Sequence, residues 1–287
     1  MGAGRFTSVE AEIDRAAHWV LGRMEARRVP AALVEFTVFG LKQAWACLFG
    51  ALMLAMILVS ALAYPEDAAL PRYDALFLGA LAIQLGMIAG RLETREEVAV
   101  IMIFHVVGTV MEVFKTSVGS WIYPEDAFFR IGGVPLFSGF MYAAVGSYLA
   151  RVSRIFDFRF THYPPFWTTL VLAAAIYVNF FTHHYGPDLR WALFAAVLVL
   201  YGRTRVHYRV FRHRLWMPLV VGFVLVALFI WFAENIGTFA RAWTYPDQAD
   251  AWRPVSIHKL GAWLLLMIIS FVLTTLVRRP RPLDPER

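Results

Sequence analysis

The sequence predicts an all-α membrane protein, a polytopic bundle of about eight transmembrane helices. The chain has 287 residues, of which 59% are hydrophobic and 17% are charged, and its mean hydropathy is +0.57. A soluble domain usually carries about 25% charged residues. Long apolar stretches alternate with short charged clusters, and the basic residues gather in alternate clusters. This segregation is typical of a chain that crosses a bilayer repeatedly.

Each apolar stretch is interpreted as one span. The eight stretches run over residues 41–63, 73–91, 97–116, 136–152, 165–183, 188–203, 215–238 and 258–277. A helix needs about 20 residues to cross the hydrocarbon layer, so the fourth and sixth stretches are short. Short spans are tolerated where they line a cavity inside the protein.

Arginine placement predicts that both termini are cytoplasmic. The clusters assigned to cytoplasmic loops contain Arg91, Arg95, Arg151, Arg154, Arg159, Arg203, Arg205, Arg209, Arg212 and Arg214. The opposite loops carry fewer basic residues, which fits the positive-inside rule. Residues 10–28 predict an amphipathic helix on the cytoplasmic surface, and the N-terminus does not resemble a cleaved signal peptide. The net charge of +6 follows from these loops and indicates no nucleic-acid partner.

An internal repeat divides the chain. The pattern E-x3-T-x4-W-x-Y-P occurs twice, beginning at Glu112 and at Glu234, 122 residues apart. Five identities at one offset indicate a duplication. Four spans separate the copies, so the halves are expected to be parallel repeats with both motifs at the outer face. We predict a cytoplasmic segment over 1–30, four-span repeats over 31–154 and 155–277, and a cytoplasmic tail over 278–287.

Polar side chains in apolar helices mark a candidate site near the outer leaflet. The predicted catalytic residues are Glu112, Glu234, His105 and Lys115. The predicted cavity or substrate-contacting residues are Thr116, Trp121, Tyr123, Asn179, His183, His184, Asn235, Thr238, Trp243 and Tyr245. A charge inside the hydrocarbon costs about 2.5–3.5 kcal/mol on insertion scales, so two such glutamates are expected to face the bundle interior. The structural alternatives are a Glu112–Lys115 pair and an interfacial aromatic belt.

Several kinds of chemistry have no motif here. The chain lacks a P-loop, a dinucleotide-binding glycine fingerprint, HExxH and GxSxG. The lone cysteine, Cys47, permits no disulfide within one chain and is interpreted as a buried small residue. No metal site is predicted, although His183 and His184 with the glutamates offer possible ligands. The sequence specifies no cofactor.

Specific stretches resemble a known family. They are KQAWACLFG from Lys42, FHVVGTVMEVFKT from Phe104, GSWIYP from Gly119, ENIGT from Glu234 and AWTYP from Ala242. They resemble bacterial membrane proteins of the domain-of-unknown-function family number 817, over nearly the whole chain. The resemblance implies a multi-pass protein of the bacterial inner membrane and carries no activity. The G-x3-E pattern from Gly108 to Glu112 is also similar to carotenoid hydratases and small lycopene cyclases, which protonate a polyene.

Three functions fit these features. The first is acid–base chemistry on an isoprenoid- or lipid-like substrate, with the glutamates as acid and base, His105 as a relay and Lys115 as a charge partner. The second is a proton-coupled carrier of a small solute. The third is a structural or haem-binding protein with His105 or His183 as ligand. The expected partners are membrane lipid and a hydrophobic small molecule.

Overall fold

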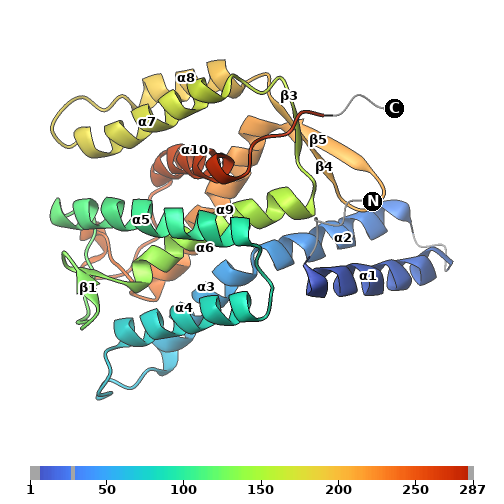
Figure 1. Cartoon of the computed structure of the whole chain (residues 1–287). Coiled ribbons are helices and arrows are strands. Elements are labelled where there is room, and N and C mark those ends of the chain that lie inside the picture. Colours follow the sequence, from blue (N-terminus) through green and yellow to red (C-terminus); the bar gives the residue numbers. More distant parts are fainter. Residues whose placement is uncertain (1–6, 27–29, 284–287) are drawn as a thin grey trace.

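A computed structural model describes residues 7–26 and 30–283, which fold mainly into helices (Figure 1). The helices are α1 (Ser8–Ala26), α2 (Ala31–Ala46), α3 (Leu48–Ala63), α4 (Arg72–Ala89), α5 (Arg95–Ser117), α6 (Phe137–Ile155), α7 (Phe166–Thr182), α8 (Arg190–Tyr201), α9 (Leu219–Phe239) and α10 (Lys259–Val277). A 3-10 turn covers Pro246–Gln248. Helix α6 lies at the centre and contacts α2, α3, α4, α5 and α10.

Four helices are long and apolar enough to cross a membrane. They are α4, α5, α9 and α10. Helices α2 and α3 together qualify as a fifth span, although the chain bends by 64° between them. The bend lies at Cys47, inside the predicted first span. Helix α8 has 12 residues and so measures about 18 Å, which is short of the roughly 30 Å hydrocarbon layer. The structure therefore gives four or five candidate spans within the described residues.

The all-α expectation missed two small sheets. Strands β1 (Arg130–Ile131) and β2 (Val134–Pro135) form a hairpin after the first W-x-Y-P segment. Strands β3 (Arg159–Thr161), β4 (Arg205–Arg209) and β5 (Arg214–Pro218) form an antiparallel sheet in the order β3-β4-β5. The arginine-rich segments assigned to cytoplasmic loops are therefore partly strands. In β4, Arg205 and Arg209 alternate with Val206 and Tyr208, which suits a sheet with two different faces.

Two arginines assigned to a loop are instead buried in α6. Arg154 contacts Glu10 at 2.5 Å and Glu97 at 2.9 Å, and Arg151 contacts Glu93 at 3.4 Å. These carboxylates come from α1, from the start of α5 and from the loop before α5. Paired charges can be buried, whereas isolated ones cannot. Glu97 also completes a capping box with Thr94 at the start of α5.

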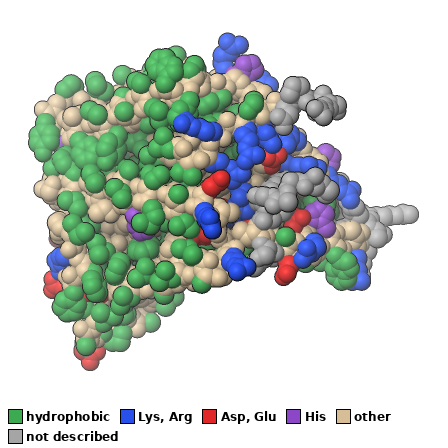
Figure 2. All heavy atoms as spheres, in the orientation of Figure 1, with side chains coloured by type: hydrophobic (Ala, Val, Ile, Leu, Met, Phe, Trp, Pro, Cys, Tyr) green, Lys and Arg blue, Asp and Glu red, His purple; other side chains and the backbone are tan. Residues whose placement is uncertain are grey.

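Charged and apolar surfaces separate along the bundle. Helix α1, the β3–β5 sheet and the chain end after α10 lie at one end, and the β1–β2 hairpin lies at the opposite end (Figure 1). On the face in Figure 2, Lys and Arg gather toward the first of these ends, while hydrophobic side chains cover much of the rest. The predicted N-terminal amphipathic helix is present as α1. Its Glu10 is buried against Arg154.

Helices α6 and α10 occupy corresponding positions in the sequence. Each has 19 residues, and α10 begins and ends 122 residues after α6. Close packing positions α6 against α5, because a Cβ at Gly108 would lie 2.5 Å from the Tyr142 ring. In the second half, a Cβ at Gly237 would lie 2.3 Å from the Trp243 ring. Glycine at these two positions lets an aromatic ring rest on the helix backbone.

Candidate functional site

A cavity of about 310 Å³ lies at the end of the bundle where α5, α7 and α9 finish and where α8 and α10 begin. Its volume falls at the lower end of the range of small-molecule sites, about 300–1,000 Å³. The inner wall is apolar and is formed by Ile176, Phe180, Leu265, Leu266 and Ile269. The charged lining residues are Lys115, Arg190, Glu234 and Lys259. The shape and lining suit a molecule with one apolar and one polar part.

Glu112 is buried beside the cavity and accepts three hydrogen bonds. Trp121 Nε1 donates at 2.9 Å, Tyr123 OH at 2.6 Å and Tyr142 OH at 2.8 Å. Burial raises the pKa of Tyr123 well above its usual value, so the phenol keeps its proton and remains a donor. The predicted alternative, a pair between Glu112 and Lys115, does not form. Three bonds leave this carboxylate little capacity for a ligand.

Glu234 has a similar environment but lines the cavity itself. Its carboxylate accepts hydrogen bonds from Tyr245 OH and, at 2.5 Å, from Trp263 Nε1. Burial also raises the pKa of Tyr245 well above its usual value, which keeps this phenol a donor. Both glutamates therefore receive a phenol eleven residues later in the sequence. Glu234 has one fewer donor than Glu112, and its side chain is 2% exposed.

The two W-x-Y-P segments meet next to this cavity. Ile122 N–H donates to the Thr244 carbonyl at 3.0 Å, and Thr244 N–H donates to the Ile122 carbonyl at 2.9 Å. These two residues occupy the same position in the two sequence copies. The Trp121 and Tyr245 rings, one from each copy, pack edge to face with centroids 6.2 Å apart. The contact brings the surroundings of both glutamates together.

Side chains in the first turn of helix α4 form hydrogen bonds with the chain of both segments. Arg72 Nε donates to the Glu125 carboxylate at 2.8 and 2.9 Å, and its guanidinium also reaches the carbonyls of Ala240 and Arg241. Asp74 accepts the backbone N–H groups of Phe128 and Phe129 at 2.7 and 2.8 Å. Arg72 was not singled out from the sequence. It links the chain after the first motif to the second one.

Lys115 contacts histidines and an aromatic ring. Its Nζ lies 2.7 Å from His184 Nε2, 3.4 Å from His183 Nε2 and 4.1 Å from the centre of the Phe180 ring. Partial burial and the neighbouring Lys115 ammonium lower the pKa of His184. The imidazole is therefore neutral near pH 7 and can accept the ammonium proton.

Asn179 organises the turn between α7 and α8. Its Oδ1 accepts Leu189 N–H at 3.0 Å, and its Nδ2 donates to Asp188 at 3.3 Å. Asp188 also forms a 3.1 Å ion pair with Arg190. At the start of α10, Lys259 Nζ lies 3.5 Å above the centre of the Tyr245 ring. Two cationic side chains missed as site candidates thus join Lys115.

Some predicted residues lie outside the cavity. The His105 ring packs edge-on against Phe140, with centroids 4.4 Å apart, on the side of α5 that contacts α6. Asn235 bonds the Trp231 carbonyl and Val255 N–H, so it fixes the second loop. Thr238 Oγ1 accepts from Trp252 at 3.2 Å. The others not placed in the lining are Thr116, Tyr123 and Trp243.

Four side chains of the site were not predicted from the sequence. They are Tyr142 and Trp263, which donate hydrogen bonds to the glutamates, and Arg190 and Lys259, which are cations in the cavity lining. The first two lie near the starts of α6 and α10, at no repeated position, so only the packing reveals them. Lys259 was visible as a lysine at the start of a predicted span. Among residues 7–26 and 30–283, no group of three or more Asp, Glu, His or Cys side chains is placed to hold a metal ion.

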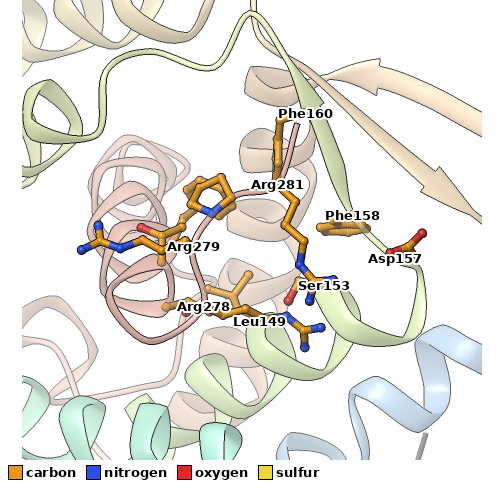
Figure 3. A pocket seen from close by; sticks show the side chains of 12 residues that line it. Leu149, Ser153, Asp157, Phe158, Phe160, Arg278, Arg279 and Arg281 are labelled. Atoms are coloured by element: carbon orange, nitrogen blue, oxygen red, sulfur yellow. The ribbon is translucent and has the colours of Figure 1, made fainter. Parts of the chain in front are cut away.

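A second pocket lies at the other end of α6 and α10 and holds only about 40 Å³. Figure 3 shows the side chains of Ser153, Arg278 and Arg281 around it. Arg279 stacks on Phe166, with its guanidinium carbon 3.6 Å from the ring centre. This volume is too small for a lipid-like molecule.

The fold and site define a helical protein with apolar helices long enough to span a membrane. The chain belongs to the DUF817 family, whose model is described as a protein of unknown function and matches residues 35–271. It is 43% identical over 256 residues to the uncharacterized protein YoaT of Bacillus subtilis (strain 168), covering 89% of this chain and 96% of YoaT. No solved structure matches. These matches confirm the resemblance to family 817 and give no support to the carotenoid-enzyme likeness.

Proposed function

We propose that the chain is a multi-pass protein of the bacterial inner membrane, made of two parallel four-span repeats with both termini cytoplasmic. The equal lengths and the 122-residue offset of α6 and α10 support the duplication. So does the antiparallel pairing of Ile122 with Thr244, because a residue that pairs with its own counterpart lies beside a two-fold axis. The eight spans then include α7 and α8 as short helices beside the cavity.

The orientation places the cavity near the outer leaflet. Strands β3, β4 and β5, whose sequences contain Arg159, Arg205, Arg209 and Arg214, lie at the end opposite β1, which follows the first W-x-Y-P segment (Figure 1). A cytoplasmic position for this basic end follows the positive-inside rule. Residues 7–26 and 278–283, the described parts of the predicted segments 1–30 and 278–287, then lie on the cytoplasmic side, and the repeats cover 31–154 and 155–277.

The function that the geometry supports best is acid–base chemistry on an isoprenoid- or lipid-like molecule. The observation that carries it is a buried carboxyl group, Glu234, in the wall of a cavity whose inner lining is aliphatic and aromatic. A carboxyl group inside an apolar site can exchange a proton with a bound hydrophobic substrate. Tyr245 and Trp263 orient it. The two glutamates therefore differ in role, since Glu112 holds the first loop.

A carrier is a weaker fit to the same cavity. Its polar lining residues gather at one end of the bundle, where Lys115, His183 and Arg190 lie at helix ends. Alternating access requires polar groups that reach the opposite face as well. The haem alternative also fits poorly, because His183 and His184 already bond Lys115 and His105 lies outside the cavity.

Native mass spectrometry of the detergent-purified protein tests this function. Ala262→Trp fills the cavity, and Ala174→Trp adds the same bulk on an exposed face of α7. The wild type and Ala174→Trp are expected to retain a co-purified hydrophobic molecule that Ala262→Trp loses. Glu234→Gln is expected to retain a different species, the unconverted substrate, which chromatography of the released molecule separates from the product even where an isomerisation leaves the mass unchanged. Equal retention by Ala262→Trp contradicts the site, and an identical species in Glu234→Gln contradicts the chemistry.

A further inference from the structure

The entrance of the cavity is basic although the helices around it are apolar. Lys115 from the end of α5, Arg190 from the start of α8 and Lys259 from the start of α10 all line it. Glu234 is the acidic residue among the lining side chains. Three cations from separate helices converge on one volume, which indicates a binding site for negative charge.

Lys115 is the most informative of the three because it is buried and lacks an anionic partner. Its side chain is 5% exposed. Its neighbours are His183, His184 and Phe180. Within the described parts of the chain, no carboxylate lies within 4.0 Å of its Nζ. A buried ammonium without a counter-charge is costly, so its retention in the wall of a cavity is explained by a ligand that supplies the charge.

Lys259, at the start of α10, is half-buried in the lining of the same cavity. Its ammonium lies over the Tyr245 ring and forms no carboxylate pair within 4.0 Å in the described structure. Arg190 differs, because Asp188 neutralises it at 3.1 Å. Two lysines therefore remain able to bind an anion, one at the end of α5 and one at the start of α10. The apolar wall of α7 and α10 residues extends inward from them.

We propose that the ligand is an amphiphile with an anionic head group, phosphate or carboxylate, held between Lys115 and Lys259. Its hydrocarbon chain lies along Ile176, Leu265 and Ile269. This inference rests on the proposed function, since it names the class of hydrophobic substrate. The head group fixes the depth of the chain beside Glu234, in the way that remote binding contacts position a reacting atom.

Equilibrium binding to the purified full-length protein tests the proposal with three ten-carbon probes: geranyl monophosphate, decanoate and geraniol. The anions are expected to bind at least tenfold more tightly than the neutral alcohol. Lys115→Met and Lys259→Met are each expected to weaken anion binding about tenfold and to leave geraniol binding unchanged. Arg253→Gln removes an exposed cation outside the lining and is expected to change neither. Anion binding should also weaken with added salt.

The outcomes separate this inference from the function beneath it. Preference for one anion over the other identifies the head group as phosphate or carboxylate. If geraniol binds as tightly as both anions and Ala262→Trp blocks this binding, the inference of an anionic head group is wrong. The proposed hydrophobic site is then retained. If no probe binds a protein with an intact unfolding transition, the proposed function fails as well. Because Lys115→Met removes a buried charge and Lys259→Met a half-buried one, the same transition verifies that both variants fold.

Discussion

Replacing Glu112 with glutamine is expected to destabilise the protein without changing the cavity lining. The carboxylate accepts bonds from Trp121, Tyr123 and Tyr142 between 2.6 and 2.9 Å. A glutamine of the same shape offers one oxygen and one NH2 group. It can accept from Trp121 and Tyr123, but its NH2 meets a third donor, Tyr142. The substitution therefore removes the charge from two bonds and reverses or breaks the third.

The expected loss is about 2 kcal/mol. Hydrogen bonds to a charged group contribute roughly 1.5–3 kcal/mol each, and neutral ones about 0.5–1.5 kcal/mol. Losing charge assistance at two bonds and disturbing a third removes about 3–4 kcal/mol. Relief from burying a charge offsets part of this loss. For a protein of this size, 2 kcal/mol corresponds to a decrease in melting temperature of roughly 4–8 °C, by analogy with soluble domains.

Unfolding of the detergent-purified protein, followed by circular dichroism, measures the effect. Glu66→Gln is the matched control, because Glu66 is exposed in the turn after α3. Its stability should stay within about 0.5 kcal/mol of the wild type. In a double-mutant cycle, Tyr142→Phe should cost less on the Glu112→Gln background than on the wild type. Equal stability of Glu112→Gln and Glu66→Gln would refute the three-donor arrangement.

Two further predictions concern other parts of the fold. Gly108→Ala should lower stability by about 1–3 kcal/mol, because its Cβ would overlap the Tyr142 ring. Gly86→Ala is the control and should not lower stability, because the space around Gly86 is open. Equal melting temperatures of the two variants would contradict this packing. Glu10 has a lowered pKa: burial raises it, but the hydrogen bonds and charge of Arg154, together with hydrogen bonds from Thr7 and Trp45, lower it by more in total. The stabilising contribution of Glu10 is therefore complete above the usual carboxyl pKa and is lost as pH falls through the lowered value. Hydrogen exchange of the amides in α1 should accelerate over that acidic range. An unchanged exchange rate in Glu10→Gln at neutral pH would contradict the contact with Arg154.

The helical part of the fold could be predicted because apolar runs determine where membrane helices form. The 122-residue offset also led to the two loops that meet at Ile122 and Thr244, since repeated residues reveal a relation between distant segments. The residues around the glutamates could be predicted only where they belong to the repeated pattern. Trp121 and Tyr123 belong to the repeated pattern and do bond Glu112.

The contacts that the sequence did not reveal are long-range pairings of single side chains. The sequence predicted Arg154 as a charged loop residue. In the structure its guanidinium contacts Glu10, which is 144 positions earlier in the chain. Lys115 was considered as a partner of Glu112 one helical turn away, but it turns to His183 and His184 at the end of α7. Strands β4 and β5 lie in a segment whose five arginines suggested topology rather than pairing. The partner of each of these side chains depends on which helices pack together.

A disulfide between Ile122→Cys and Thr244→Cys tests most directly whether the two motifs meet beside the cavity. Residues that exchange both backbone hydrogen bonds have Cα atoms about 5.5 Å apart, within the roughly 4.4–6.8 Å that a disulfide spans. In a Cys47→Ala background, oxidation is expected to link these two positions, and mass spectrometry of the digest should recover the joined peptides. Ile122→Cys with the exposed Asp250→Cys serves as the control pair and should not link. Absence of the 122–244 link under conditions that oxidise accessible thiols would contradict the paired arrangement of the motifs.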